Sequence, residues 1–233
     1  MKNLIKINVI VSLFLISIQC RGDWGRPEGV PEDAVYNRKL NLYTHKIDGY
    51  EYRWFENGKL IAKVKLNEVG LNEGPIETYD YNTGVVISRG TYKMSEKSGK
   101  WEWAFSDGKP YYEMNFSPGV RKRKFWYPTI EWGNENGPYF RYFPNGRVSE
   151  KGMYDGGNRS GDWVKYYPDT KIESKGSYAE DLKVGEWFYY YPDGRKESME
   201  KYNDKGELIF RQTYYPNGSL WCETKQTQTP ICN

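Results

Sequence analysis

Cysteine is the residue type whose positions suggest chemistry most directly in this chain, and three cysteines occur in its 233 residues. The first, Cys20, directly follows a signal-like segment in which two lysines precede an apolar run over residues 9–18. Such a segment is typical of a signal peptide, and the run is too short to span a bilayer. We therefore predict that residues 1–19 are removed and that Cys20 carries lipid, although Gln19 replaces the small residue that usually precedes a lipidated cysteine. A soluble secreted chain and an uncleaved anchor are the alternatives.

The other two cysteines, Cys222 and Cys232, lie close together near the end of the chain. Exported compartments are oxidising, so this spacing favours a disulfide that holds the C-terminal tail against the preceding structure. An unstrained bridge closing so short a loop contributes roughly 2 to 3 kcal/mol to the free energy of unfolding. Two free cysteines in a frayed tail are the alternative.

Residues with the spacing needed for catalysis or metal binding are sparse. The single histidine, His45, has no cysteine or carboxylate at a metal-ligand spacing, so we expect it to be an exposed surface residue. No nucleophile elbow, phosphate-binding loop or cysteine–histidine pair occurs. The acidic residues fall mainly at turns and alternating positions, and none stand out as a pair for glycoside hydrolysis. We expect a non-enzymatic protein without metal or cofactor.

A basic and aromatic segment interrupts an otherwise periodic sequence. The interval from Phe116 to Gly137 is 21 residues, whereas its counterpart from Tyr154 to Gly161 is 7, so 14 residues have been inserted within positions 117–136. Cations beside aromatic rings suit an acidic glycan, an anionic headgroup or an acidic patch on a partner. A longer hairpin with packed rings and solvated cations is an equal alternative. The predicted binding residues are Arg121, Lys122, Arg123, Lys124, Trp126, Tyr127 and Trp132.

The elements that would position these residues follow from a period of 24 residues. The phrases FPNG, YPDT, YPDG and YPNG begin at residues 143, 167, 191 and 215. Each lies between two short runs rich in aromatic and β-branched residues, the pattern of a β-hairpin. We expect the Asn-Gly and Asp-Gly pairs to supply the positive φ angles of the turns. Weaker copies extend the array to seven units, or fourteen strands, across residues 49–226.

Side-chain alternation within the units predicts how the strands pack. Tyr139, Trp163 and Trp187 share one face with the aromatic residue four positions later in each unit. Gly152 and Gly176 recur at positions where a neighbouring ring can lie over a bare glycine. A strict period of this length indicates stacked units stabilised by contacts between neighbours. The predicted fold class is all-β: an elongated single-layer antiparallel meander of stacked 24-residue β-hairpin repeats.

The units GDWVKYYPDTKIESKGSY and GEWFYYYPDGRKESMEKY resemble the bacterial variant of the MORN repeat, often labelled YwqK-type antitoxins. The resemblance covers about three quarters of the chain, with turn, aromatic and glycine positions in register. It implies a binding or scaffolding module, and the antitoxin label implies a protein partner. The chain departs from such antitoxins by its export signal, because they are regarded as cytoplasmic.

The net charge and the order of the segments predict the domain organisation and the location of the protein. Loss of residues 1–19 removes Lys2 and Lys6 and lowers the formal net charge from +3 to +1, which argues against nucleic-acid binding. We expect a lipidated cysteine and tether over 20–47, repeats over 48–226 and a tail over 227–233. The predicted protein lies in the bacterial cell envelope, anchored by lipid to the outer membrane or cell surface, and binds a protein or envelope glycan. The alternatives are an immunity protein that neutralises a toxin, and a glycan-binding module resembling choline-binding repeats.

Overall fold

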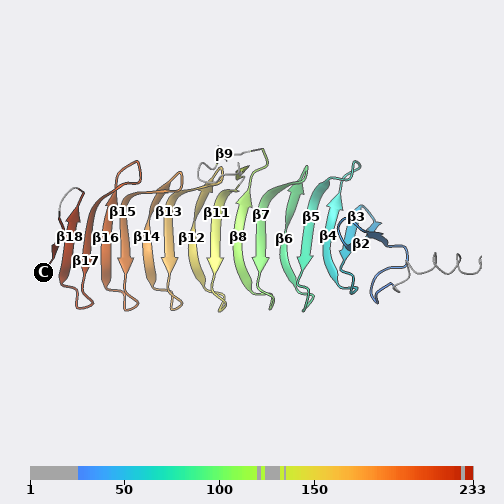
Figure 1. The fold of residues 1–233 in the computed structure, drawn as a ribbon, viewed down its shortest axis with the longest axis horizontal. Helices are drawn as coiled ribbons and strands as arrows, with labels where there is room; N and C mark the ends of the chain where they lie inside the picture. The colour runs from blue at the N-terminus through green and yellow to red at the C-terminus, as the bar shows by residue number, and fades with distance from the viewer. Residues whose placement is uncertain (1–25, 120–121, 124–131, 134, 227–228, 233) are drawn as a thin grey trace, which may run out of the picture.

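The computed structural model describes residues 26–119, 122–123, 132–133, 135–226 and 229–232. Its strands lie side by side in one long row (Figure 1). In chain order they are β1 (Val35–Asn37), β2 (Leu42–Ile47), β3 (Tyr50–Trp54), β4 (Leu60–Leu66), β5 (Asn72–Tyr79), β6 (Val86–Lys93), β7 (Glu96–Ala104), β8 (Pro110–Phe116), β9 (Lys122–Arg123), β10 (Trp132–Gly133), β11 (Glu135–Tyr142), β12 (Val148–Asp155), β13 (Asn158–Tyr166), β14 (Ile172–Ala179), β15 (Leu182–Tyr190), β16 (Lys196–Tyr202), β17 (Leu208–Tyr214), β18 (Leu220–Lys225) and β19 (Ile231–Cys232).

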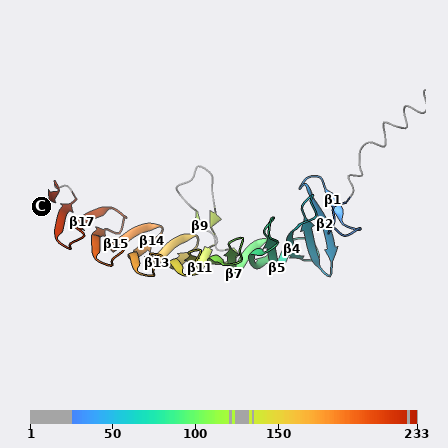
Figure 2. The same ribbon diagram turned by 90° about the horizontal axis from the view of Figure 1, so that it is seen from below.

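Seventeen of these strands form one antiparallel sheet. Neighbours in sequence pair with one another throughout, and β8 pairs with β11, so the sheet continues past the insert. Strands β9 and β10 pair only with each other, as a separate small hairpin. Figure 2 shows the large sheet nearly edge-on, as a single layer with the β9 segment projecting from it. The predicted elongated, single-layer antiparallel meander is confirmed.

The fourteen strands expected from the repeat are β3 to β8 and β11 to β18, and three short strands extend the row at its ends. Two of these, β1 and β2, lie in the segment assigned to the tether. The preceding residues Val30 and Ala34 are buried against Trp54, with Tyr43 of β2 beside them. The tether boundary at residue 47 is therefore wrong, because apolar side chains in this segment cover the ring that the first repeat would otherwise expose.

The repeated turns differ in one respect from expectation. Positive φ occurs at Gly146, Gly194 and Gly218 (81°, 92° and 90°), but not at the preceding Asn or Asp. Those polar side chains instead accept a backbone hydrogen bond two residues later, as when Asn145 Oδ1 accepts from the N–H of Arg147 at 3.0 Å. Thr170 takes the glycine position in one copy, at φ 76°. Each turn thus needs one residue with positive φ and one side-chain acceptor.

One face of the sheet carries a ladder of tryptophans, here called the tryptophan face. Trp101, Trp163 and Trp187 are only 3 to 4% exposed. Each ring lies over a glycine of the preceding strand, where a Cβ atom would come within 2.2 to 2.3 Å of ring carbons. The indole N–H groups donate to backbone carbonyls at 3.0 to 3.2 Å. The expected packing of rings on bare glycines is confirmed, and the glycines are Gly90, Gly152 and Gly176.

Candidate functional site

The predicted binding insert is described only at its base and stem. Arg121, Lys124, Trp126 and Tyr127 lie outside the described residues. The backbone of Lys122–Arg123 in β9 pairs with Trp132–Gly133 in β10, which sets Trp132 opposite Arg123.

The base of the insert is held at both ends. Gly119 donates its N–H to a Glu96 carboxylate oxygen at 2.9 Å, and Asn136 donates to the Ser117 hydroxyl at 3.1 Å. The insert therefore leaves and re-enters the sheet at a fixed place, between β8 and β11.

The other residues selected from the sequence lie near the ends of the sheet. Cys20 lies outside the described residues. Cys222 and Cys232 form a disulfide with a Cα–Cα distance of 4.1 Å, and it joins β19 to β18. His45 lies on β2 with its side chain largely buried and Nδ1 3.5 Å from an Asp33 carboxylate oxygen. The expectation of an exposed histidine is therefore wrong, since the side chain is only 17% exposed and lies beside Asp33, which precedes β1.

Cations cover the rings of the tryptophan face. Each of the three buried tryptophans follows, four positions later, a basic residue on the same strand. Lys97 Nζ lies 4.8 Å from the Trp101 ring centroid, and Lys183 Nζ lies 4.8 Å from that of Trp187. Burial lowers the pKa of both lysines, with nearby carboxylates opposing the shift. These contacts close the ring faces to solvent, which leaves little aromatic surface here for a ligand.

The third cation of this face, the guanidinium of Arg159, also lies over aromatic rings. It lies 3.9 Å from the centroid of the Tyr178 ring and 5.9 Å from that of Trp163. Its Nε contacts Asp181 at 3.1 Å, across to the next turn. The same cation therefore links two successive units by a ring contact and an ion pair.

A buried carboxylate breaks the ladder in the last full unit. The period of 24 places a glycine at 152 and 176 and a tryptophan at 163 and 187, but the next two equivalents are Glu200 and Arg211. The glycines at 152 and 176 lie at register shifts between their strands, whereas Glu200 pairs directly with Arg211, so that shift is absent here. An ion pair thus occupies the place that a ring over a glycine holds in earlier units. The sequence analysis missed it, although the repeat alignment contained the signal.

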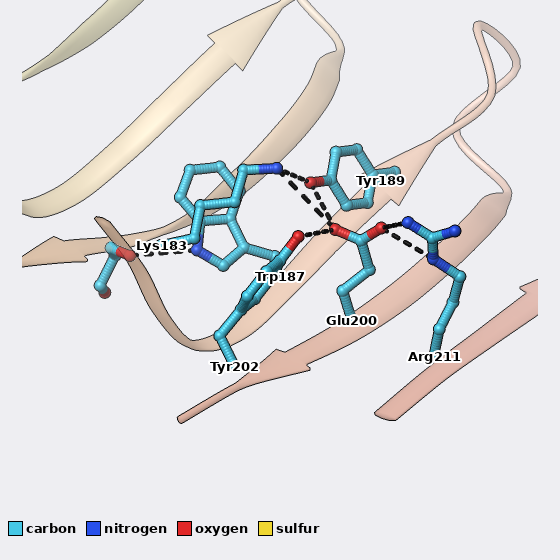
Figure 3. Close-up of polar contacts among 7 residues, drawn as sticks. Lys183, Trp187, Tyr189, Glu200, Tyr202 and Arg211 are labelled. Atoms are coloured by element: carbon cyan, nitrogen blue, oxygen red, sulfur yellow. Dashed lines mark hydrogen bonds and ion pairs between the residues drawn. The ribbon is translucent and has the colours of Figure 1, made fainter. Parts of the chain in front are cut away.

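Figure 3 shows how the Glu200 carboxylate is surrounded. The residue is 5% exposed. Tyr189 and Tyr202 donate their hydroxyls to Oε2 at 2.8 and 2.7 Å. Arg211 donates to Oε1 from Nε at 2.9 Å and from a second guanidinium nitrogen. Lys183 Nζ lies 3.8 Å from Oε2 and donates to the Tyr189 hydroxyl at 2.5 Å.

The surroundings fix the protonation state of this group. Burial by itself would raise the pKa of Glu200, but hydrogen bonds from Tyr202, Tyr189 and Arg211 outweigh it and lower the pKa overall. Burial and the bond to Glu200 raise the pKa of Tyr202 to about 12 and that of Tyr189 further. At neutral pH the carboxylate is ionised and accepts from protonated tyrosines. With its oxygens engaged, it is arranged as a structural clamp rather than as a general base.

The face opposite the tryptophans differs along the sheet. Cross-strand partners define a central row on this face, running Lys63, Glu77, Arg89, Glu102, Glu113, Phe140, Lys151, Val164, Lys175, Phe188, Met199. In the first part, the charges from Arg89 to Glu113 neutralise one another, whereas Lys63 lies over the Tyr50 and Tyr52 rings. Glu102 contacts both Arg89 and Lys100, and Lys100 also contacts Glu113 at 2.8 Å. A shallow depression of about 450 Å³ lies beside these pairs.

In the second part of the row the cations have aromatic neighbours instead of acidic ones. Lys151 Nζ lies 5.8 Å from the Tyr166 centroid and Lys175 Nζ 5.7 Å from that of Phe188. Lys196, on β16, lies 5.8 Å from the same Phe188 ring and 5.5 Å from Tyr214. All three lysines are exposed, and none has a carboxylate within ion-pair distance in the described part of the chain. We call the following set the lysine stripe: Phe140, Lys151, Val164, Lys175, Phe188, Lys196 and Met199.

Comparison with known families places these features in a repeat class. The model of the MORN repeat variant matches residues 47–67 and 183–204. The second match contains Lys183, Trp187 and Glu200, and the first contains all of β3 and β4. No curated protein matches the chain. The matched segments are therefore similar to MORN-variant repeats, in agreement with the resemblance seen in the sequence.

Membrane-spanning helices and metal-binding clusters are two further features that bear on the site. The described residues contain no helix that is both long and apolar enough to cross a membrane. They also contain no group of three or more His, Cys, Asp or Glu side chains placed to hold a metal ion.

Proposed function

We propose that the chain is a lipid-anchored, non-enzymatic repeat protein that binds a macromolecular partner in the cell envelope or outside the cell. One observation carries the proposal: a single-layer sheet covers the tryptophans of one face with its own cations, while the other face has exposed lysines that have no acidic partner among the described residues. Such a face offers a long surface with charge and aromatic groups in register.

The position of the insert supports a second contact region. It interrupts the array between β8 and β11, where the opposite face changes from paired charges to the lysine stripe. Insertions in repeat arrays often lie on a binding face. A partner of ordinary interface size could contact the stripe and the insert together.

The binding function is tested with the mature chain, residues 20–233, by chemical crosslinking in envelope preparations and in the surrounding fluid. A partner crosslinked in fixed stoichiometry is expected. Replacement of Arg121, Lys122, Arg123 and Lys124 by Ser should weaken its capture in a salt-sensitive way, because loop substitutions leave the sheet intact. A matched variant replaces four exposed lysines elsewhere, Lys39, Lys46, Lys93 and Lys205. Absence of a partner from both preparations contradicts the proposal.

Substitution of the tryptophans in the insert distinguishes a binding role from a structural one. Replacing Trp126 and Trp132 by Ala should weaken capture if the rings contact the partner. If they pack on the sheet, the variant should instead lose thermal stability while the lysine and arginine variant keeps full binding.

The anchor is tested separately. The proposal expects wild type to partition into detergent and the Cys20→Ser variant to remain in the aqueous phase. A mature N-terminus elsewhere than Cys20, with both forms aqueous, contradicts lipid attachment but leaves the binding function open.

A further inference from the structure

We propose that the lysine stripe binds an extended acidic polypeptide segment with a carboxylate at about every third residue. The inference rests on the proposed binding function and names the partner chemistry for one surface. Its basis is that Lys151, Lys175 and Lys196 are exposed cations without acidic partners among the described residues, set among half-buried apolar side chains.

The spacing of the cations selects an extended chain. The three lysines lie on β12, β14 and β16, so each is two strands from the next. Strands are about 4.8 Å apart, which separates Lys151 from Lys175 by about 9.6 Å across the sheet. Lys196 pairs with Tyr190 and is therefore also displaced along its strand from the row through Phe188 and Met199, so it lies farther from Lys175. A polyproline II segment rises about 3.1 Å per residue and returns to the same face every third residue, after about 9.3 Å. Carboxylates at i and i+3 would therefore meet Lys151 and Lys175, and a carboxylate farther along the segment would meet Lys196 beside the row.

The side chains between the lysines select a polypeptide over other polyanions. Val164 lies between Lys151 and Lys175 in the row, and Phe188 lies between Lys175 and Met199. Aliphatic and aromatic groups alternating with cations suit a ligand whose own apolar groups alternate with its charges. Anionic glycans and nucleic acids carry denser charge and offer no aliphatic groups to Val164 and Met199.

The part of the same face that adjoins the stripe carries paired charges. Between β6 and β8, Arg89 and Lys100 contact Glu102, and Lys100 also contacts Glu113. An acidic ligand there would have to displace existing carboxylates. Along the stripe it meets cations whose charge is not already neutralised, so association should be steered electrostatically and should weaken with salt.

The test uses the mature chain and a fluorescent peptide of about fifteen residues with the repeat Glu-Pro-Pro, which is pre-set in the extended form. Fluorescence anisotropy should show salt-sensitive binding that falls about tenfold or more in a Lys151→Glu, Lys175→Glu, Lys196→Glu variant. The control variant Lys39→Glu, Lys93→Glu, Lys205→Glu makes the same change in net charge at exposed lysines elsewhere. It should retain most of the affinity. A Lys-Pro-Pro peptide should not bind.

Three results would overturn the inference. An equal loss of peptide affinity in the two charge-reversed variants would mean that binding depends only on the net charge of the protein. Absence of peptide binding by the folded wild-type protein would contradict the inference directly. Tighter binding of anionic phospholipid vesicles or hyaluronate fragments, with the same dependence on the three lysines, would assign the stripe to another ligand class. In each case a partner crosslinked to the insert would leave the proposed binding function standing.

Discussion

The β14–β15 and β16–β17 strand pairs occupy equivalent places one repeat apart, but they differ in local register and in their central pairs. The first has a register shift at Gly176, whereas the second is in register through Glu200 and Arg211. In the first, Trp187 lies over Gly176, and its indole N–H donates to the Ser177 carbonyl at 3.0 Å. In the second, 24 residues later, Arg211 donates to Glu200 instead. The Trp187–Gly176 contact depends on the shape and burial of the ring. The Arg211–Glu200 contact depends on opposite charges and on four hydrogen-bond donor groups that converge on the carboxylate. The comparison shows that the order of the strands is kept from one repeat to the next, while the central pair and its local register change together.

The two pairs should respond differently to the loss of one member. Removing the ring leaves a cavity, whereas removing one charge leaves the other without its partner. Because each unit contacts only its neighbours, the effects should be local and should be measured by amide hydrogen exchange as well as by denaturant.

The largest effect is expected from the ring. Trp187→Ala should lower the free energy of unfolding by about 3 to 5 kcal/mol, the usual cost of removing a buried tryptophan. Protection from exchange should fall most in β14, β15 and β16. The control is Trp221→Ala, since Trp221 is 48% exposed and should cost less than about 1 kcal/mol. Similar losses at the two sites would contradict the central place given to the ladder.

A somewhat smaller loss is expected from the ion pair. Glu200→Ala should cost about 3 kcal/mol, the lower end for a broken buried pair, because the Arg211 side chain is itself half exposed. The double variant Glu200→Gly, Arg211→Trp converts this unit to the chemistry of the preceding one. It should recover most of the stability in urea unfolding. A double variant less stable than Glu200→Ala would show that the two units are not interchangeable.

The disulfide should contribute less, and only at one end. Cys222→Ser with Cys232→Ser should lower stability by roughly 2 kcal/mol, since the closed loop is short. Exchange protection should be lost in β18 and β19 and unchanged in β14. Protection lost equally along the sheet would mean that the bridge acts on the whole array and not only on its last hairpin.

The smallest effect is a dependence on pH. The pKa of Glu200 is lowered in the folded chain, against about 4.3 in an unfolded one. Its contribution is therefore present above about pH 5 and is lost as pH falls through the folded pKa. The stability difference between wild type and Glu200→Gln should be constant from about pH 5 to 7 and should shrink below about pH 4. A difference independent of pH would mean that the carboxylate is not ionised in the folded chain.

The sequence predicts the parts of the fold that repeat. The fourteen central strands, the rings over Gly152 and Gly176 and the shared face of the tryptophans all follow from a period of 24 and a strand period of two. The two strands ahead of the repeats do not, because β1 and β2 lack the turn phrase and join the sheet through burial of Val30 and Ala34 beside Trp54.

The sites are harder to predict for a related reason. The lysine stripe joins residues of different strands, and only the cross-strand register shows that Lys151, Val164 and Lys175 are neighbours. The disulfide was predicted from spacing and is present. Lipid at Cys20 and binding by the insert stay predictions. Arg121, Lys124, Trp126 and Tyr127 of the insert, like Cys20, lie outside the described residues, and Lys122, Arg123 and Trp132 are described as backbone only.

The single row of strands has a mechanical consequence. In Figure 1 the strands run across the long axis of the molecule. Tension applied between the two ends would therefore load one strand pair at a time, and the hydrogen bonds of each pair would open in sequence and not together. At the far end, the bridge between Cys222 and Cys232 would keep β18 and β19 joined as peeling began there. The sheet would lengthen in steps of one hairpin under low force, as an extensible linker that shortens again when the load is removed.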